Sequence, residues 1–258
     1  SDDSTPEDLE AIPNLPFALT VLRMPENEGN AGGVRAAMDL AFAKGADAVW
    51  ILDDDSWPRP DALEAMLEEP YDDSLVLHPL QIDPASGKFT WPLQIFSGGK
   101  WSLAFSMDEL PAGKRTKSRG VWTGALVSRK IREAIGPVRG ELFIRGEDEE
   151  YPWRMAKAGF AHAAVHSAIL DHPGPPDIVH WSFLGKHFFF ERGLPDWKLH
   201  YKIRNMIWLK RKQSGGPKAL LTFSAYLTAV CIFDGLHRLR LLFAAFRDGW
   251  CGRLGKLP

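Results

Sequence analysis

Asp53, Asp54 and Asp55 form a run of three carboxylates directly after the apolar segment 48–52. Closely spaced carboxylates repel one another, which makes the run costly unless a cation lies beside it. Hard divalent ions such as Mg²⁺ or Mn²⁺ bind one or two carboxylates and keep their other positions for phosphate oxygens and water. The run therefore predicts a divalent-metal site. The alternative interpretation is a solvated turn before a helix capped by Asp61.

Two later segments also carry groups that can do chemistry. Residues 147–150 read Glu-Asp-Glu-Glu at the start of a predicted helix. Acidic side chains suit a helix N-terminus electrostatically, but four in succession exceed that need. Farther along, the loop 171–176 places His172 directly before Pro-Gly-Pro-Pro. The prolines hold this loop rigidly, and an imidazole can bind Mn²⁺.

The pattern before the carboxylate run predicts the elements that position it. We expect a short apolar strand at 17–22, a loop rich in Gly and Asn at 25–33, and a helix at 34–44 that ends at Gly45. The buried strand 48–52 follows. This order is a βαβ unit, which implies a parallel sheet with ligands at the carboxyl ends of its strands. The Gly-rich loop and the carboxylate run would then lie at the same edge.

Further elements follow along the chain. We expect strands at 75–77, 121–127 and 163–170, and helices at 61–68, 128–135, 147–159 and 198–212. Residues 79–120 contain Pro, Gly and aromatic residues without a clear strand pattern. Alternating strands and helices predict an α/β fold.

Length and composition describe an ordinary globular protein. A chain of 258 residues is long enough for one large domain with an ample core. Its 45% hydrophobic and 25% charged residues exclude a disordered or collagenous chain. The two cysteines, Cys231 and Cys251, exclude a disulfide framework and a zinc ligand set, and favour a reducing compartment. The polar, acidic opening 1–5 predicts no signal peptide.

The C-terminal segment 202–258 is strongly basic. It holds 11 Lys and Arg against Asp234 and Asp248, so it carries +9 while the rest of the chain carries −11. This asymmetry predicts an anionic partner, and because the usual nucleic-acid-binding motifs are lacking, we expect a membrane face and no nucleic acid. The apolar run 219–233 has 15 residues, fewer than the roughly 20 of a membrane-spanning helix. We therefore expect tail helices that lie on a membrane or pack on the domain.

Taken together, four motifs resemble a known family. They are, in order, Asn-Glu-Gly-Asn-Ala-Gly-Gly at 27–33, Trp-Ile-Leu-Asp-Asp-Asp-Ser-Trp-Pro at 50–58, Trp-Thr-Gly-Ala at 122–125 and Gly-Glu-Asp-Glu-Glu-Tyr at 146–151. Their order and spacing resemble an inverting family 2 glycosyltransferase of the GT-A fold. The resemblance covers nearly the whole chain and is closest to the rhamnosyl- and galactofuranosyltransferase branch. In that branch a histidine in a Pro-rich loop and a Tyr-x-x-Arg-Asn segment follow, which here are His172 and 201–205.

The resemblance implies a fold, the boundaries of its domains and a missing N-terminal part. Residues 1–195 would form an α/β domain with a mostly parallel GT-A sheet flanked by helices, and residues 196–258 a basic, partly apolar helical tail. Family members begin with a strand and a turn upstream of the segment that Asp2 and Asp3 resemble. We therefore expect this sequence to be truncated, without its first strand and part of the nucleotide pocket.

The resemblance also implies a ligand set. Asp53, Asp55 and His172 would hold Mn²⁺ or Mg²⁺ on the donor's diphosphate, with Asp54 against the ribose or the donor sugar. A metal there stabilises the charge of the departing nucleoside diphosphate. For His172 the alternative is an ordinary loop residue, and other histidines compete with it for the same role: His162, His166, His180 and His187.

By the same resemblance, Asp148 is the candidate general base. It would remove the proton of the acceptor hydroxyl as that oxygen attacks the anomeric carbon. Neighbouring acids would raise its pKa, which helps a base. Glu147 is the rival for this role, and a solvated helix start is the alternative interpretation.

Three more residues are expected at the acceptor. Trp122 and Gly124 resemble the floor of the acceptor site, where an aromatic face stacks on a sugar ring. A core tryptophan is the alternative for Trp122. Glu149 is expected on the acceptor side, where it would cap and orient the helix.

The donor site is expected to include residues from both ends of the chain. Asp2 or Asp3 resembles the acid that contacts the nucleotide base or ribose, although a frayed terminus is the alternative. Arg23 would approach the phosphates, and a surface arginine is its alternative. Arg204 resembles a position near the donor phosphates, whereas the alternative is a basic helix face.

The resemblance thus predicts a metal-dependent inverting glycosyltransferase. It would move a galactofuranose- or rhamnose-type sugar from a UDP- or dTDP-sugar to a cell-surface glycan or a lipid-linked acceptor. The tail would hold it peripherally on the cytoplasmic face of a membrane. Two alternatives are a non-catalytic protein of the same fold that binds glycan or nucleotide, and a sugar nucleotidyltransferase.

Overall fold

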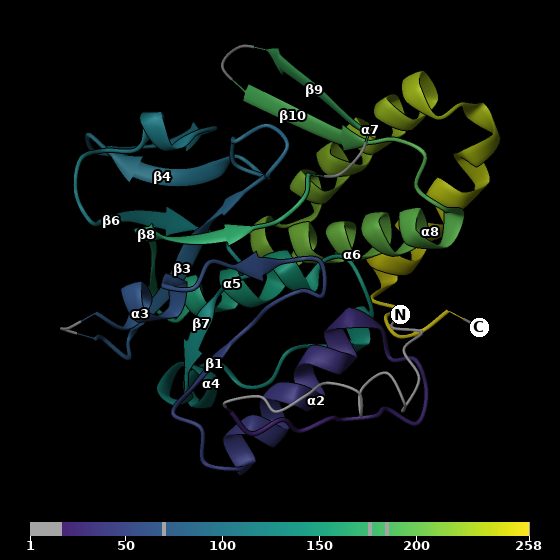
Figure 1. The fold of residues 1–258 in the computed structure, drawn as a ribbon. Coiled ribbons are helices and arrows are strands. Elements are labelled where there is room, and N and C mark those ends of the chain that lie inside the picture. Colours follow the sequence, from purple (N-terminus) through teal and green to yellow (C-terminus); the bar gives the residue numbers. More distant parts are fainter. Residues whose placement is uncertain (1–16, 69–70, 175–176, 184–185, 258) are drawn as a thin grey trace.

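The computed structural model describes residues 17–68, 71–174, 177–183 and 186–257 (Figure 1). Its strands are β1 (Ala48–Trp50), β2 (Trp57–Pro58), β3 (Leu75–Ile82), β4 (Leu93–Ser97), β5 (Lys100–Ala104), β6 (Arg115–Arg119), β7 (Leu126–Ser128), β8 (Ala161–Asp171), β9 (Ile178–Phe183) and β10 (Lys186–Glu191). Its α-helices are α2 (Gly29–Ala43), α3 (Ala62–Leu67), α4 (Arg129–Ile135), α5 (Glu147–Lys157), α6 (Asp196–Ser214), α7 (Gly216–Phe233) and α8 (Leu239–Cys251). Short 3₁₀ turns are η1 (Met107–Glu109), η2 (Gly140–Leu142) and η3 (Leu236–Arg238). This order confirms the predicted α/β class.

A mixed sheet lies at the centre of the molecule. Its strand order is β1-β7-β3-β8-β6-β4-β5, and β2 pairs with β8 as the eighth strand. Only β3 and β8 pair in parallel, while the other strand pairs of this sheet are antiparallel within the described residues. The sheet is therefore mixed instead of mostly parallel as predicted. One reason is the tight turn at Gly98 and Gly99, both with positive φ, which joins β4 to β5 as antiparallel neighbours.

Strands β1, β3 and β8 of this sheet run in the same direction. β7 is antiparallel to both β1 and β3, and β3 is parallel to β8. The carboxyl ends of β1, β3 and β8 therefore lie at one edge. The carboxylate run 53–55 follows β1, and His172 follows β8. The sheet directions thus carry the predicted metal ligands to the same edge although only one strand pair is parallel.

The N-terminal part of the predicted βαβ unit differs from the expectation. Residues 17–22 form no strand, since they are exposed and have no partner strand among the described residues. Helix α2 begins at Gly29, so the Gly-rich loop runs directly into it. Its first N–H groups are already used: Gly29 donates to Asn27 Oδ1 at 2.8 Å, and Ala31 donates to the Phe143 carbonyl at 3.0 Å.

Separate apolar clusters hold the sheet and the C-terminal helices. Met38 of α2, Ile131 of α4 and Tyr151 of α5 are buried in the cluster that packs on β1 and β7. Helices α6, α7 and α8 share a second cluster, to which Phe190 and Leu194 contribute. These helices lie together on the right of Figure 1, whereas α2 lies at the bottom. Helix α6 begins at Asp196, where the predicted tail begins.

Helix α7 is longer than the predicted apolar run. It has 18 residues, because Gly216, Pro217 and Lys218 form its first turn. It is the one helix in the described part of the chain that is long and apolar enough to cross a membrane, and 22% of that window is buried. A single helix of this kind is weak evidence for a crossing, since core helices and signal sequences satisfy the same length and composition.

Candidate active site

Asp53, Asp55 and His172 converge at the carboxyl edge of the sheet. One ligand atom of each lies within 4.8 Å of the others, and His172 Nε2 lies 3.3 Å from Asp55 Oδ1. We call these three residues the acidic cluster. Over residues 17–68, 71–174, 177–183 and 186–257, no other group of His, Cys, Asp or Glu side chains meets this condition. The structure thus brings together the three predicted ligands and leaves the competing histidines outside.

The pairing of β2 with β8 explains this convergence. Trp57 lies opposite Asp171, so the turn that follows the carboxylates is held against the end of β8. Arg59 reinforces the pairing, because its Nε and Nη2 donate to the two carboxylate oxygens of Asp171 at 3.1 and 3.0 Å. The N–H of His172, the next residue, donates to the carbonyl of Ile82 at the end of β3. The backbone therefore fixes the spacing between the carboxylates and the imidazole.

Thr123 belongs to this site although it was not among the predicted residues. Its hydroxyl donates to Asp53 Oδ2 at 2.5 Å, and its carbonyl accepts a hydrogen bond from Gln81 Nε2 at 2.7 Å. The signal in the sequence was its place between Trp122 and Gly124, in a motif already noted. A hydroxyl beside a carboxylate orients that carboxylate and limits its rotation.

The electrostatics of the acidic cluster suit a divalent cation. Burial raises the pKa of Asp53, and the charges of Asp55 and Asp54 raise it further, whereas Thr123 and His172 lower it. A cation would remove this repulsion. Asp55 is exposed, so the cluster is open to a ligand from solvent. Two carboxylates and one imidazole are a donor set that fits Mn²⁺, with Mg²⁺ as the harder alternative.

The two candidate bases at the start of α5 have different surroundings. Glu147 is 3% exposed, its Oε1 accepts from Asn30 Nδ2 at 3.1 Å, and its buried Oε2 has no hydrogen-bond partner among the described residues. Burial raises the pKa of Glu147 to about 7, and the charge of Asp148 adds to this shift. Asp148 is exposed, and its Oδ1 accepts from the Gly146 N–H at 2.8 Å. The protein packed around the Asp148 carboxyl raises its pKa, and Glu149 raises it further.

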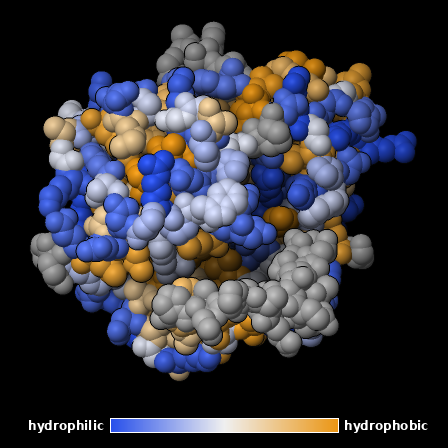
Figure 2. Space-filling view, in the orientation of Figure 1, coloured by the Kyte–Doolittle hydropathy of each residue, from blue (hydrophilic) through white to orange (hydrophobic). Residues whose placement is uncertain are grey.

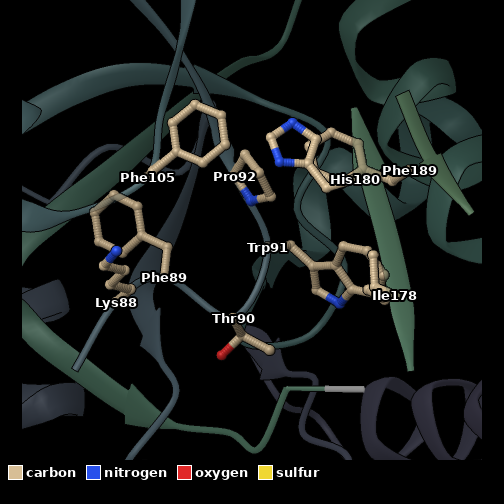
Figure 3. A pocket seen from close by; sticks show the side chains of 9 residues that line it. All are labelled: Lys88, Phe89, Thr90, Trp91, Pro92, Phe105, Ile178, His180 and Phe189. Carbon is tan, nitrogen blue, oxygen red and sulfur yellow. The ribbon is translucent and has the colours of Figure 1, made fainter. Parts of the chain in front are cut away.

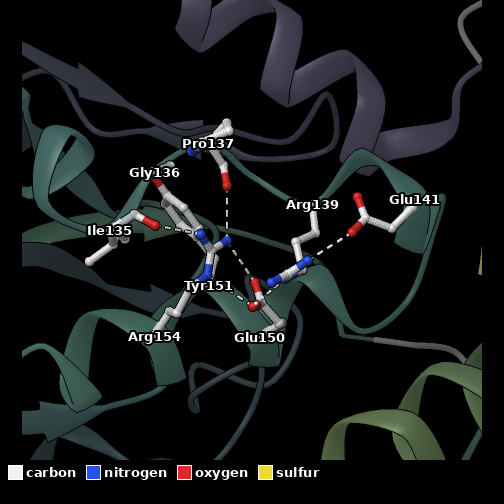
Figure 4. Close-up of polar contacts among 8 residues, drawn as sticks. All are labelled: Ile135, Gly136, Pro137, Arg139, Glu141, Glu150, Tyr151 and Arg154. Atoms are coloured by element: carbon white, nitrogen blue, oxygen red, sulfur yellow. Dashed lines mark hydrogen bonds and ion pairs between the residues drawn. The ribbon is translucent and has the colours of Figure 1, made fainter. Parts of the chain in front are cut away.

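Glu150 anchors the first turn of α5 (Figure 4). Its buried carboxylate accepts hydrogen bonds from Arg154 Nε and Nη2, both at 2.9 Å, and from Arg139 Nε at 3.1 Å. Arg154 also donates to the carbonyls of Ile135 and Pro137, at 2.7 and 2.9 Å. These contacts tie α5 to the end of α4. They fix the orientation of the helix start that carries both candidate bases.

Trp122 and Gly124 lie in the core. Trp122 is 5% exposed and packs edge-on against Tyr151, with ring centroids 5.9 Å apart. Gly124 has φ +84°, and a Cβ there would lie 2.9 Å from the ring of Pro79. These positions support the core alternative for Trp122. The exposed aromatic face expected at the acceptor site is not supplied by this residue.

Arg204 is also placed differently from the expectation. It is 1% exposed, and its Nη1 and Nη2 donate to the carbonyls of Gly255 and Leu142 at 2.6 and 3.2 Å. Its Nε donates to Asn205 Oδ1 at 2.9 Å. Because these acceptors occupy the guanidinium, Arg204 ties α6 to η2 and to the C-terminal residues.

The remaining predicted site residues lie at the surface or outside the described part of the chain. Arg23 and Asp54 are exposed, Asp54 within the carboxylate run. Glu149 Oε2 accepts from Lys210 Nζ of α6 at 2.8 Å, so it links the base-bearing helix to the tail. Asp2 and Asp3 lie outside the described residues.

Comparison with known proteins gives this site a family. The model of glycosyl transferase family 2 matches residues 1–136. The chain is 31% identical over 170 residues to galactofuranosyltransferase GlfT1 of Mycobacterium tuberculosis, covering 64% of this chain and 55% of that protein. It is 28% identical over 184 residues to GlfT1 of Mycolicibacterium smegmatis, covering 67% and 59%. The chain thus spans little more than half the length of these curated relatives.

A solved structure, GalNAc-T7 with UDP, GalNAc and Mn²⁺, aligns with 72% of this chain and 35% of its own, at a TM-score of 0.45 and 14% identity. The curated relatives confirm the predicted similarity to the galactofuranosyltransferase branch. The family match covers more than half of the chain. The chain belongs to glycosyl transferase family 2.

Proposed function

We propose that this chain is the donor-binding and catalytic part of a metal-dependent inverting glycosyltransferase. The acidic cluster carries the proposal, because a chain of this family has a donor set for Mn²⁺ or Mg²⁺ open to solvent at the carboxyl edge of its sheet. The named activity of its relatives supports a galactofuranose-type sugar, with rhamnose-type as the neighbouring choice, carried by UDP or dTDP. The acceptor would be a cell-surface glycan or a lipid-linked sugar.

The acidic cluster would serve the leaving group. A divalent ion held by Asp53, Asp55 and His172 would neutralise the charge that develops on the departing diphosphate. Asp54 would contact the ribose or the donor sugar, and Arg23 the phosphates. Asp2 or Asp3 would contact the nucleotide base or ribose.

Asp148 would serve the incoming hydroxyl. The acceptor oxygen attacks the anomeric carbon while the bond from that carbon to the diphosphate breaks, and the hydroxyl proton passes to the Asp148 carboxylate. Attack opposite the leaving group inverts the anomeric centre. Two observations favour Asp148 over Glu147: Asp148 is exposed, whereas Glu147 is buried and bonded to Asn30. Glu149, held by Lys210, would keep this side of the acceptor site in place.

Isothermal titration with UDP and dTDP in the presence of Mn²⁺ tests the metal assignment. We expect nucleotide binding that depends on Mn²⁺ and that falls at least tenfold in His172→Ala, because one of three ligands is lost. His237→Ala, an exposed histidine on η3, is the matched control and should bind normally. Absence of nucleotide binding in the unsubstituted chain would contradict the proposal.

Asp148→Asn tests the base. Transfer should be lost while binding of Mn²⁺ and nucleotide stays within about twofold, because the amide cannot accept the proton. Turnover that survives in Asp148→Asn and disappears in Glu147→Gln would reassign the base to Glu147. Nucleotide binding without any transfer would favour the non-catalytic alternative.

We also propose that the tail, residues 196–258, lies peripherally on an anionic cytoplasmic membrane face, with residues 1–195 as the catalytic domain. Large apolar side chains are exposed on α7, η3 and α8, namely Leu220, Leu221, Ile232, Leu236 and Phe243. Figure 2 shows hydrophobic residues gathered at the upper right, over the helices of the tail. Basic residues surround them in the sequence, a combination typical of interfacial helices.

Sedimentation with vesicles tests this contact. The chain should bind phosphatidylglycerol vesicles more strongly than phosphatidylcholine vesicles, and less strongly as salt increases. Leu221→Glu should weaken the binding severalfold, whereas Leu63→Glu, at an exposed leucine of α3, should not. Equal binding of both variants would exclude α7 from the contact.

A further inference from the structure

An aromatic recess, whose lining side chains are shown in Figure 3, lies beside the acidic cluster. It has a volume of about 300 Å³ and lies between the loop 88–92 and the β9–β10 hairpin. The residues that define it here are Phe89, Thr90, Trp91, Phe105, His180 and Phe189. Apart from His180, which competed with His172 as a metal ligand, these residues have no role that follows from the motifs of the sequence.

The recess is joined directly to the acidic cluster. Thr90 Oγ1 donates to the carbonyl of His172 at 2.6 Å, and the Thr90 N–H donates to the Gln81 carbonyl at 3.1 Å. Gln81 in turn donates to the carbonyl of Thr123, the residue that bonds Asp53. The wall of the recess and two residues of the cluster therefore share one hydrogen-bonded network. A ligand in the recess would lie next to the proposed reaction centre.

The recess has the chemistry of a sugar-binding surface. His180 stacks on Phe189 at 4.5 Å and 7° between ring planes, and Phe105 lies 5.8 Å from His180. Trp91 is 40% exposed, so one large aromatic ring is available to a ligand. A sugar ring presents C–H groups on its faces and hydroxyls at its edge, which match aromatic faces beside polar groups. Here the polar groups are those of Lys88, Thr90 and His180.

Size and composition favour a sugar over a nucleotide or a lipid chain. A volume of about 300 Å³ is at the lower end of ligand pockets, which suits a single glycosyl residue and not a whole nucleotide-sugar. Pro92 and Ile178 are the aliphatic side chains of the lining, whereas a pocket for an isoprenoid or acyl chain would be mainly aliphatic.

We propose that the aromatic recess is a subsite for one glycosyl residue of the acceptor, which stacks on Trp91. This inference rests on the proposed function and deepens it, because the exposed aromatic face expected of buried Trp122 is supplied instead by Trp91. The subsite would hold the acceptor chain while its terminal hydroxyl meets the donor.

Saturation-transfer NMR on the full chain tests the subsite with two probes, methyl β-D-galactofuranoside and methyl α-L-rhamnopyranoside. Ring protons of at least one glycoside should receive saturation. Trp91→Ala should weaken that binding about tenfold, the size expected from the loss of one aromatic contact, and Trp91→Phe should restore most of it. Trp101→Ala is the matched control, since Trp101 lies on β5 against Phe96 and Arg119, away from the recess, and should leave binding unchanged.

Three results would overturn the subsite: no saturation of either glycoside, equal affinities in the unsubstituted chain and Trp91→Ala, or saturation of farnesyl phosphate in place of the glycosides. Titration of the same samples with UDP and Mn²⁺ separates this inference from the proposed function. If Trp91→Ala binds UDP normally and glycosides normally, the subsite is wrong and the donor site stands. If UDP never binds but glycoside binding depends on Trp91, the recess binds a glycosyl residue, whereas the transferase proposal, and with it the assignment of that residue to an acceptor, is wrong.

Discussion

Thr123 holds Asp53 through a 2.5 Å hydrogen bond, and this contact joins the first carboxylate of the acidic cluster to the loop before β7. The same loop is bonded to β3 through Gln81, so the carboxylate is oriented by the central strands of the sheet. A metal ligand oriented in this way loses little rotational freedom when an ion binds. The hydroxyl is therefore expected to contribute to metal affinity without touching the metal.

Replacing this hydroxyl gives the first prediction. Thr123→Val keeps the shape of the side chain but removes the donor, so Mn²⁺ affinity should fall about tenfold, as for other residues that orient metal ligands. Thr123→Ser restores the hydroxyl and should bind almost normally. Mn²⁺ titration followed by electron paramagnetic resonance measures both, and equal affinity in Thr123→Val would show that the bond does not orient Asp53.

Glu147 should make stability depend on pH. Its pKa is about 7 in the folded chain against 4.5 for a glutamate exposed to water, so the folded state binds more protons between these pH values. Stability contributed by protonated Glu147 is therefore lost as pH rises from about 4.5 to 7. The difference corresponds to about 3 kcal/mol. Glu147→Gln should be more stable than the unsubstituted chain at pH 8, by roughly 1 to 3 kcal/mol, and similar at pH 4.5.

Urea unfolding at both pH values measures the effect of Glu147→Gln. Glu149→Gln provides the control, because the Glu149 carboxylate is partly exposed and paired with Lys210. This control should show no gain at pH 8. A Glu147→Gln variant that is no more stable than the unsubstituted chain at pH 8 would mean that Glu147 is ionised at little cost.

His78 should lower the stability of the fold as the pH falls, whereas Glu147 lowers it as the pH rises. It is 1% exposed on β3, Nε2 lies 2.6 Å from Ser118 Oγ, and burial lowers its pKa to about 4. The unfolded chain binds a proton near pH 6.5 that the folded chain takes up only near pH 4, so stability falls as pH drops through this window. The full effect is about 3 kcal/mol.

His78→Leu removes this proton-linked loss. The free energy of unfolding of both proteins is compared at pH 7 and at pH 4. The loss on lowering the pH should be smaller in His78→Leu than in the unsubstituted chain, by about 3 kcal/mol. The variant strands the Ser118 hydroxyl, which lowers stability by about 1 kcal/mol at every pH. Comparison with the double variant His78→Leu/Ser118→Ala, in which no hydroxyl is left without a partner, isolates that constant loss. Parallel pH profiles for His78→Leu and the unsubstituted chain would contradict the prediction.

Gly124 is needed for its backbone and its lack of a side chain. Gly124→Ala combines φ +84° with a Cβ 2.9 Å from Pro79, and should lower stability by about 1 to 3 kcal/mol. Gly33→Ala is the matched control, because Gly33 lies within α2 with open space at its Cβ. It should raise stability by roughly 0.5 to 1 kcal/mol. Thermal unfolding of both variants checks the pair, and equal midpoints would show that the loop before β7 adapts.

Local chemistry made several elements predictable from the sequence. Ser128 precedes an amphipathic run, and in the structure its hydroxyl caps α4 by accepting from the Ile131 N–H at 3.1 Å. The acidic start and apolar face of α5 were likewise visible. The direction of strand pairing was not, because it depends on contacts between distant segments. The two-residue strand β2 is too short to leave a pattern, yet its pairing with β8 assembles the acidic cluster.

The candidate site was predictable in its charged residues and not in their neighbours. Adjacent carboxylates and a histidine directly before a Pro-rich stretch suggest a metal by their chemistry alone. A threonine such as Thr123 is common in any strand or loop, so only the geometry reveals its contact with Asp53. The sequence pattern around Trp122 is the same for a tryptophan in the core and for one at the acceptor site. The structure favours the core.

Because β2 must pair with β8, the acidic cluster forms only when the sheet is complete. Asp55 precedes β2 and His172 follows β8, so the three ligands meet only after a late segment has joined the sheet beside an early one. An ion that binds the assembled site but not the unfolded chain would add its binding free energy to the cooperativity of folding. High metal affinity would then require that β2 has paired with β8. A fragment that ends at residue 136, where the family match ends, would lack the imidazole of His172 and bind the ion weakly.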